Sequence, residues 1–176
     1  RYCNNATGTL SGLFHIGPEC AATEASPAER LPAMLEMFQA SNNDLKRLGL
    51  KVAEAALQME GISRIVGAEY QGIKERASLW RPKTYGEWSV EYRRYWDCLV
   101  NEMRSWDDEL RKDANSAIIS VAAGQLGIPS HVEMVLAVLE QLSTDRMTDM
   151  RLLSHFIISW VHRNKEKDDR SISFRL

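Results

Sequence analysis

The sequence predicts an all-α fold, a helical bundle built on a long antiparallel helix hairpin with shorter flanking helices. Apolar residues recur at spacings of three and four over two long stretches of the 176-residue chain, as they do along helices with one buried face. Helix-capping signals precede these stretches. No segment alternates apolar and polar residues for long enough to form a sheet.

The N-terminal part of the chain lacks this periodicity. Residues 1–25 contain several residues that disfavour helices, and we expect them to form an irregular arm. A capping box at 26–29, with Pro27 at the first helical position, then opens the helical bundle domain that we expect over 26–164. Pro32 should shorten the first helix or make it restart. The residues that disfavour helices in the arm are Gly8, Gly12, Gly17 and Pro18.

The strongest periodic signal predicts one helix over about 43–80, with a single apolar stripe held across about ten turns. At a rise of 1.5 Å per residue, this helix would be on the order of 50 Å long. The glycines inside it either allow another helix to pack closely or mark a kink, and Pro82 ends the run. The stripe comprises Leu45, Leu48, Val52, Ala55, Met59, Ile62, Val66, Tyr70, Ile73, Ala77 and Trp80.

A second stripe predicts a helix of matching length over about 86–122, after a capping box at 84–87. Because only a few residues separate the two long helices, they should fold back on each other as an antiparallel hairpin. The second stripe comprises Trp88, Tyr92, Tyr95, Leu99, Met103, Trp106, Leu110, Ala114, Ala117 and Val121.

Two shorter helices should follow, and the mixed charges of residues 165–176 then predict an exposed C-terminal tail. A capping box at 130–133 opens the first of them. We expect its inward face to carry Val135, Leu136, Leu139 and Leu142, and that of the second to carry Met147, Met150, Leu153, Ile157, Trp160 and Val161.

The composition is that of a soluble globular domain, with 44% hydrophobic residues, 26% charged residues and a formal net charge of −2. No overall charge therefore draws the chain toward nucleic acid or acidic lipid. No apolar run approaches the roughly 18 residues of a membrane-spanning helix.

The three cysteines leave the cellular compartment open. Cys3 and Cys20 could close a disulfide loop, and Asn5 begins a glycosylation triplet, which would matter in a secretory protein. An odd number of cysteines does not favour a disulfide framework, so an intracellular location is slightly favoured. Cys98 lies within a periodic helix and should be a buried thiol.

We expect no catalytic residue, bound metal or cofactor, because the patterns that would indicate them are missing from the sequence. The acidic run 107–109, with Asp113, should form a solvated, salt-bridged helix face. His155 and His162 lie two turns apart, too far for both to bind one metal without help from another element. An enzyme with scattered catalytic residues stays an alternative, to be recognised by a deep pocket holding two or more of His131, His155, Asp149 and Glu109.

The most informative cluster is the turn that joins the two long helices. From Arg76 to Trp96, five basic residues against two acidic ones give a local charge of +3, interleaved with aromatic rings. Such residues dominate protein-binding hot spots and also stack on bases and neutralise phosphates. Most of these rings would equally close the end of the bundle. The candidate binding residues are Arg81, Lys83, Tyr85, Trp88, Arg93 and Arg94.

We therefore expect a non-enzymatic interaction or scaffold module that binds a protein partner or self-associates, because the long apolar stripes need covering along their whole length. The first alternative is a nucleic-acid-binding protein that uses the basic, aromatic tip of the hairpin. The second is a membrane-active bundle, although the mixed charge of its polar faces makes a membrane surface the weaker partner.

Overall fold

The computed structural model describes residues 6–17, 23–59 and 78–173, with side chains described as far as residue 165. Every regular element in these ranges is a helix, which confirms the all-α prediction. The elements are α1 (Ala6–Gly12), α2 (Pro27–Gln39), α3 (Asn43–Leu57), α4 (Tyr85–Glu102), the 3₁₀ turn η2 (Met103–Ser105), α5 (Asp108–Gln125), the 3₁₀ turn η3 (Pro129–His131), α6 (Val132–Thr144) and α7 (Met150–Ser173).

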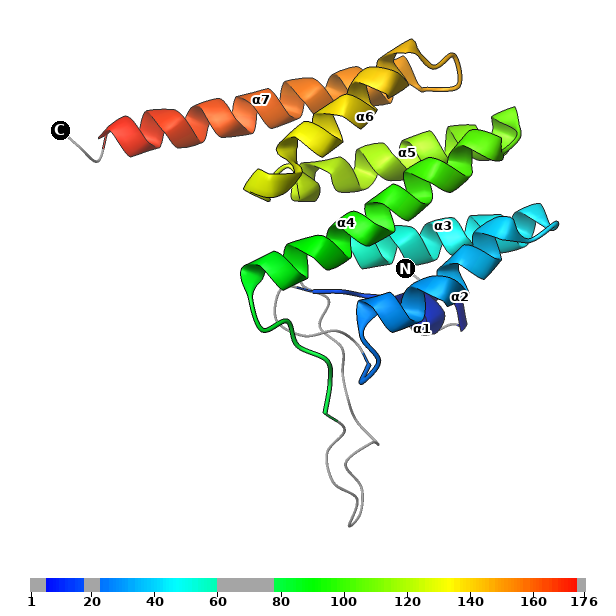
Figure 1. Cartoon of the computed structure of the whole chain (residues 1–176). Coiled ribbons are helices and arrows are strands. Elements are labelled where there is room, and N and C mark those ends of the chain that lie inside the picture. The colour runs from blue at the N-terminus through cyan, green and yellow to red at the C-terminus, as the bar shows by residue number, and fades with distance from the viewer. Residues whose placement is uncertain (1–5, 18–22, 60–77, 174–176) are drawn as a thin grey trace.

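Successive helices run in opposite directions and form the hairpins α2/α3, α4/α5 and α6/α7, which lie one above another (Figure 1). The second helices of the hairpins pack side by side, α3 on α5 and α5 on α7, and α2 packs on α4. The helix α1 covers part of α3 at one end of this stack. The hairpin α6/α7 forms the other end, and α7 extends beyond the helices below it (Figure 1).

The start of the domain follows the sequence prediction. Ser26 and Glu29 form the reciprocal capping box, with the Glu29 amide donating to Ser26 Oγ at 3.3 Å and Glu29 Oε2 accepting from the Ser26 amide at 2.8 Å. The helix α2 then continues through Pro32 to Gln39, so it neither stops early nor restarts. Asn42 caps α3 through a 2.7 Å hydrogen bond to the Asp44 amide.

The prediction of one continuous helix over 43–80 is wrong. The helix α3 ends at Leu57, Gln58 has extended backbone angles, and residues 78–84 are not helical. The part of the stripe between 60 and 77 lies outside the described residues. The Leu57 carbonyl, left without a partner in its own helix, accepts a 2.8 Å hydrogen bond from the buried side chain of Gln125. The helix end is therefore stabilised by α5.

The predicted second helix, 86–122, is also interrupted. It breaks at η2, and α5 begins after Asp107, whose carboxylate accepts a 2.9 Å hydrogen bond from the Leu110 amide. The acidic run 107–109 is therefore a helix start, where carboxylates are favoured by the helix dipole. All ten positions of the predicted stripe are nevertheless buried. The long hairpin of the prediction is thus replaced by shorter helices that share one core.

The described residues near each end of the chain are more regular than the sequence indicates. The predicted irregular arm contains α1, and its Phe14 and Ile16 are buried. His15 Nδ1 lies 3.2 Å from the Ala55 carbonyl oxygen, which ties this segment to α3. The backbone of α7 continues to Ser173, through most of the predicted tail. The division of the chain into arm, domain and tail stays a prediction.

Candidate functional site

The predicted tip residues Lys83, Tyr85 and Trp88 lie together at the N-terminus of α4. With Pro82 and Thr84 they line a shallow pocket of about 280 Å³. Thr84 caps the helix by accepting a 3.1 Å hydrogen bond from the Glu87 amide, and Glu87 Oε2 accepts from the Lys83 amide at 2.7 Å. The predicted capping box thus fixes the backbone of Lys83, which precedes the cap, and of Tyr85, the first residue of the helix.

Trp88 serves mainly as a packing residue. Its side chain is buried, its indole N–H donates to the Gly17 carbonyl, and its ring lies 4.9 Å from that of Tyr92. Tyr85 packs on the outer side of Trp88, with ring centroids 5.1 Å apart, and remains 60% exposed. Of the two rings predicted to bind, only Tyr85 presents a large surface to a partner.

The basic residues of the predicted site do not converge on this pocket. Arg93 and Arg94 lie further along α4, where neighbouring residues point about 100° apart. Arg93 Nε lies 3.9 Å from Asp97 and Arg94 Nε lies 3.6 Å from Glu91, so each guanidinium has a carboxylate neighbour. Arg81 is exposed before the helix. Nucleic-acid binding at the tip stays a prediction, and no contact in this part of the structure favours it.

A buried polar network that the sequence did not indicate joins α4 to α5 and η3. His131 Nδ1 lies 2.9 Å from Gln125 Oε1, and His131 Nε2 lies 2.8 Å from Ser89 Oγ. Because the Gln125 amide nitrogen donates to the Leu57 carbonyl, its oxygen faces His131. The imidazole therefore donates from Nδ1 to Gln125, and its Nε2 lies between the Ser89 hydroxyl and the Ser89 carbonyl oxygen, 3.0 Å from the latter. Burial lowers the pKa of His131 below its ordinary value.

The order of groups in this network, hydroxyl to imidazole to an orienting oxygen, is that of serine nucleophiles. The chemistry does not follow, because Ser89 and His131 are both buried and the third group is a neutral amide. Neither residue lines the shallow pocket at the tip. Ser130, which the sequence predicted to cap α6, instead lies 2.8 Å from Ser89 through its hydroxyl, and His131 takes the cap position. The network holds helices together.

The other polar candidates are distributed over the surface. The predicted salt-bridged face is present: Arg47 contacts Glu109 at 2.7 Å and Asp113 at 3.1 Å. His155 and His162 are exposed. Within the described ranges, no group of three or more His, Cys, Asp or Glu side chains could hold a metal ion.

The cysteines and the glycosylation triplet add no site in the described part of the chain. Burial raises the pKa of the Cys98 thiol to about 11, which disfavours the reactive thiolate. The predicted Cys3–Cys20 disulfide and the Asn5 triplet lie outside the described residues. Among the helices that the structure describes, none combines the length and hydrophobicity needed to cross a membrane.

The largest departure from the predicted burial pattern is on α7. Three residues expected to face the core, Met150, Ile157 and Val161, are 49%, 46% and 51% exposed, and Ile158 is 58% exposed. Only Leu153 is fully buried among the side chains described on this helix. The physical reason is the position of α7 at the end of the stack, where a neighbour covers one side only (Figure 1). We call Met150, Ile157, Ile158 and Val161 the α7 outer face.

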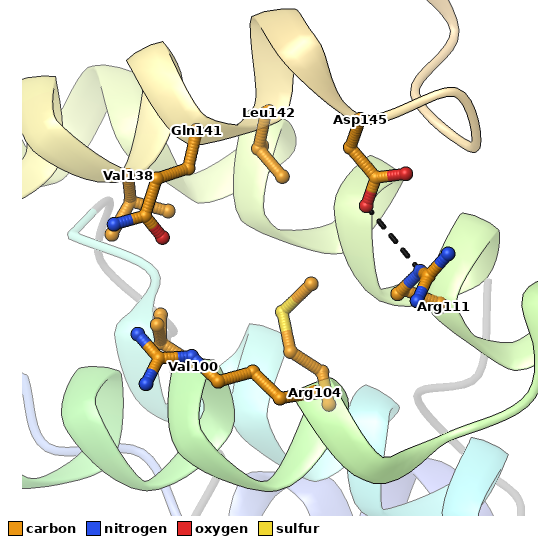
Figure 2. A pocket seen from close by; sticks show the side chains of 8 residues that line it. Val100, Arg104, Arg111, Val138, Gln141, Leu142 and Asp145 are labelled. Carbon is orange, nitrogen blue, oxygen red and sulfur yellow. Dashed lines mark ion pairs between the residues drawn. The ribbon is translucent and has the colours of Figure 1, made fainter.

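A second pocket lies between α4 and α6, which make few contacts with each other. It has a volume of about 180 Å³ and combines apolar walls with arginine and amide side chains. In Figure 2, Arg104 projects from the lower wall, Gln141 from the upper wall, and the Arg111–Asp145 ion pair lies at one end. None of the histidines and acidic residues expected for a scattered catalytic site lines it.

In comparisons with known proteins, no protein-family model, no curated protein and no solved structure significantly matches the chain.

Proposed function

We propose that this protein is a non-enzymatic helical interaction module that self-associates through the α7 outer face. The observation that carries the proposal is the concentration of exposed apolar side chains at one end of the stack. Of the nine large hydrophobic side chains that are exposed in the described residues, six belong to α6 and α7. Contiguous exposed apolar surface of this kind is typical of interaction sites.

The position of this surface supports the same proposal. In the described part of the chain, α6/α7 is the outermost hairpin of the stack (Figure 1), and Ile157, Ile158 and Val161 lie on the side of α7 that no other described helix covers. The flank of the same helix next to this face packs Leu153 into the core and partly buries Phe156 and Trp160. The apolar surface of α7 thus extends beyond what its own hairpin stack covers.

The chemistry of the surface favours a second copy as the occupant. Association in a head-to-tail manner would need a second, complementary apolar patch elsewhere on the molecule. The exposed hydrophobic residues away from α6 and α7, Leu45, Tyr85 and Val90, are scattered over different elements. The face that best matches the α7 outer face is therefore the same face of another copy, related by a two-fold axis.

The size of the surface predicts modest affinity. The α7 outer face spans from Met150 to Val161, about 17 Å along a helix at 1.5 Å per residue. Tight interfaces bury about 800 Å² on each partner, contributed by about 20–30 residues, and a single helix face supplies fewer. We therefore expect a two-fold dimer that forms in the micromolar range and dissociates on dilution.

Sedimentation equilibrium across low micromolar to several hundred micromolar protein tests this proposal. The wild-type protein should shift from monomer to dimer, and the double variant Ile157→Glu with Val161→Glu should remain monomeric. Leu152→Glu is the matched control, because Leu152 is 39% exposed on the same helix but points about 140° away from Ile157. A wild-type protein that stays monomeric throughout, or a control that dissociates as the double variant does, would refute the proposal.

A further inference from the structure

The pocket between α4 and α6 has the features of a binding site for a small ligand, separate from the α7 outer face. Its apolar wall comes from the α4/η2 segment and from α6, through Val100, Met103, Val138 and Leu142. Each of these side chains is more than nine-tenths buried, yet each still borders the pocket. A volume of about 180 Å³ corresponds to about six water molecules at the density of the liquid.

The charges around the pocket do not balance. Arg111 lies 3.1 Å from Asp108 and 3.3 Å from Asp145, and Arg146 lies 2.9 Å from the second oxygen of Asp108. These two guanidinium groups and two carboxylates neutralise one another. Arg104 adds a further positive charge to the pocket lining.

The positive charge of Arg104 is the one that no carboxylate of this group neutralises. Within the part of the chain that the structure describes, its side chain makes no hydrogen bond or ion pair. Its guanidinium lies across the pocket from the Gln141 carboxamide, which supplies a second N–H donor (Figure 2). Both side chains are exposed at the rim of the pocket (Figure 2), and an arginine fork facing an amide donor is suited to a carboxylate, which accepts hydrogen bonds at both oxygens.

The combination of these features specifies a ligand with an anionic head and a short apolar tail. We propose that the pocket between α4 and α6 binds a small aliphatic monocarboxylate, with the carboxylate between Arg104 and Gln141 and the tail against Val138 and Leu142. The single negative charge of such a ligand cancels the surplus positive charge. Arg111 keeps its partner Asp145 and forms the end wall of the pocket.

Titration calorimetry with hexanoate tests the proposal, with hexanamide as the neutral ligand of the same length. A hydrogen bond to a charged group contributes enough that hexanoate should bind about ten-fold more tightly than hexanamide, or better. Hexanoate should also shift the NMR methyl signals of Val100, Val138 and Leu142. Equal affinity for the two ligands, or shifts confined to other methyl groups, would overturn the assignment.

The variant Arg104→Gln locates the anion. It should weaken hexanoate binding by about ten-fold and leave hexanamide binding unchanged. Lys112→Gln is the matched control, since Lys112 is an exposed cation on α5 that does not line the pocket. If both variants weaken hexanoate equally, a diffuse electrostatic attraction explains the binding and the proposed site is wrong. These measurements do not depend on the oligomeric state, so they are independent of the proposed self-association.

Discussion

Mild acidification should destabilise this protein through the buried histidine His131. The imidazole is 1% exposed, and it uses both nitrogens in hydrogen bonds to Gln125 and Ser89. Burial is the main cause that lowers its pKa, and the nearby Arg93 lowers it further. The Ser89 carbonyl, 3.0 Å from Nε2, and Asp97 oppose this shift without reversing it.

The sign of the effect follows from proton linkage. The folded-state pKa of His131 is below the ordinary value of 6.5, so the unfolded chain binds more protons at pH values between the two. Stability is therefore highest above the unfolded-state value and falls as the pH drops through it. The loss between about pH 7.5 and about pH 5.5 is at most about 1.4 kcal/mol for one histidine. Burial lowers the pKa of His15 as well, which adds to the slope in the same direction.

Urea unfolding curves at a series of pH values measure this loss, and His131→Asn isolates its source. The asparagine amide can still donate toward Gln125 but has no atom at the position of Nε2 next to Ser89, so the variant should lose about 1–3 kcal/mol of stability at neutral pH. That deficit should shrink by up to about 1.4 kcal/mol at about pH 5.5, because the variant has no imidazole to protonate.

Ser130→Ala is the matched control for this experiment, because it removes an exposed hydroxyl at the end of the network and leaves His131 in place. Its stability difference from the wild type should not change with pH. A constant deficit for His131→Asn across the same pH range would show that the histidine does not titrate on unfolding, and would refute the reasoning.

Three further predictions concern packing, capping and thiol reactivity. Gly49→Ala should lower the free energy of unfolding by about 1 kcal/mol or more, because its Cβ would lie 2.8 Å from the buried Phe38 ring, whereas Gly86→Ala, with its nearest neighbour 3.8 Å away, should leave it unchanged or raise it. Asp107→Ala should cost about 1 kcal/mol in urea unfolding, because α5 loses its N-cap. Cys98 should react slowly with iodoacetamide at about pH 8 and faster in urea, because burial raises its pKa to about 11.

The buried face of the α4/α5 region could be predicted from sequence although its helix boundary could not. The apolar spacing passes from Met103 through Trp106 to Leu110 without interruption, so periodicity alone gives one helix. The break depends on Asp107, whose carboxylate caps α5. The acidic run 107–109 both starts α5 and contributes to the salt-bridged face, so its charge pattern alone does not mark the turn.

The spatial arrangement of the polar groups was harder to predict than the core, for two physical reasons. Arg93 and Arg94 lie more than two turns beyond Lys83 and Tyr85 along α4 and point about 100° apart, so residues close in sequence are spread out in space. The Ser89–His131 contact joins residues 42 positions apart in sequence, and its geometry is set by how α4 and η3 pack. A contact between residues so far apart cannot be predicted from local spacing. The capping boxes at 26–29 and 84–87 join residues within one helical turn and could be predicted.

The two proposed surfaces follow from where the stacked hairpins pack incompletely. Along the second helices, α3, α5 and α7 pack continuously, and the apolar residues of α5 are covered on both sides. Among the first helices, α2 meets α4 closely but α4 meets α6 sparsely, which leaves the pocket with Arg104 and Gln141. Beyond α7 no described helix follows, which leaves Ile157, Ile158 and Val161 exposed. The helix pair α6/α7 therefore borders both surfaces.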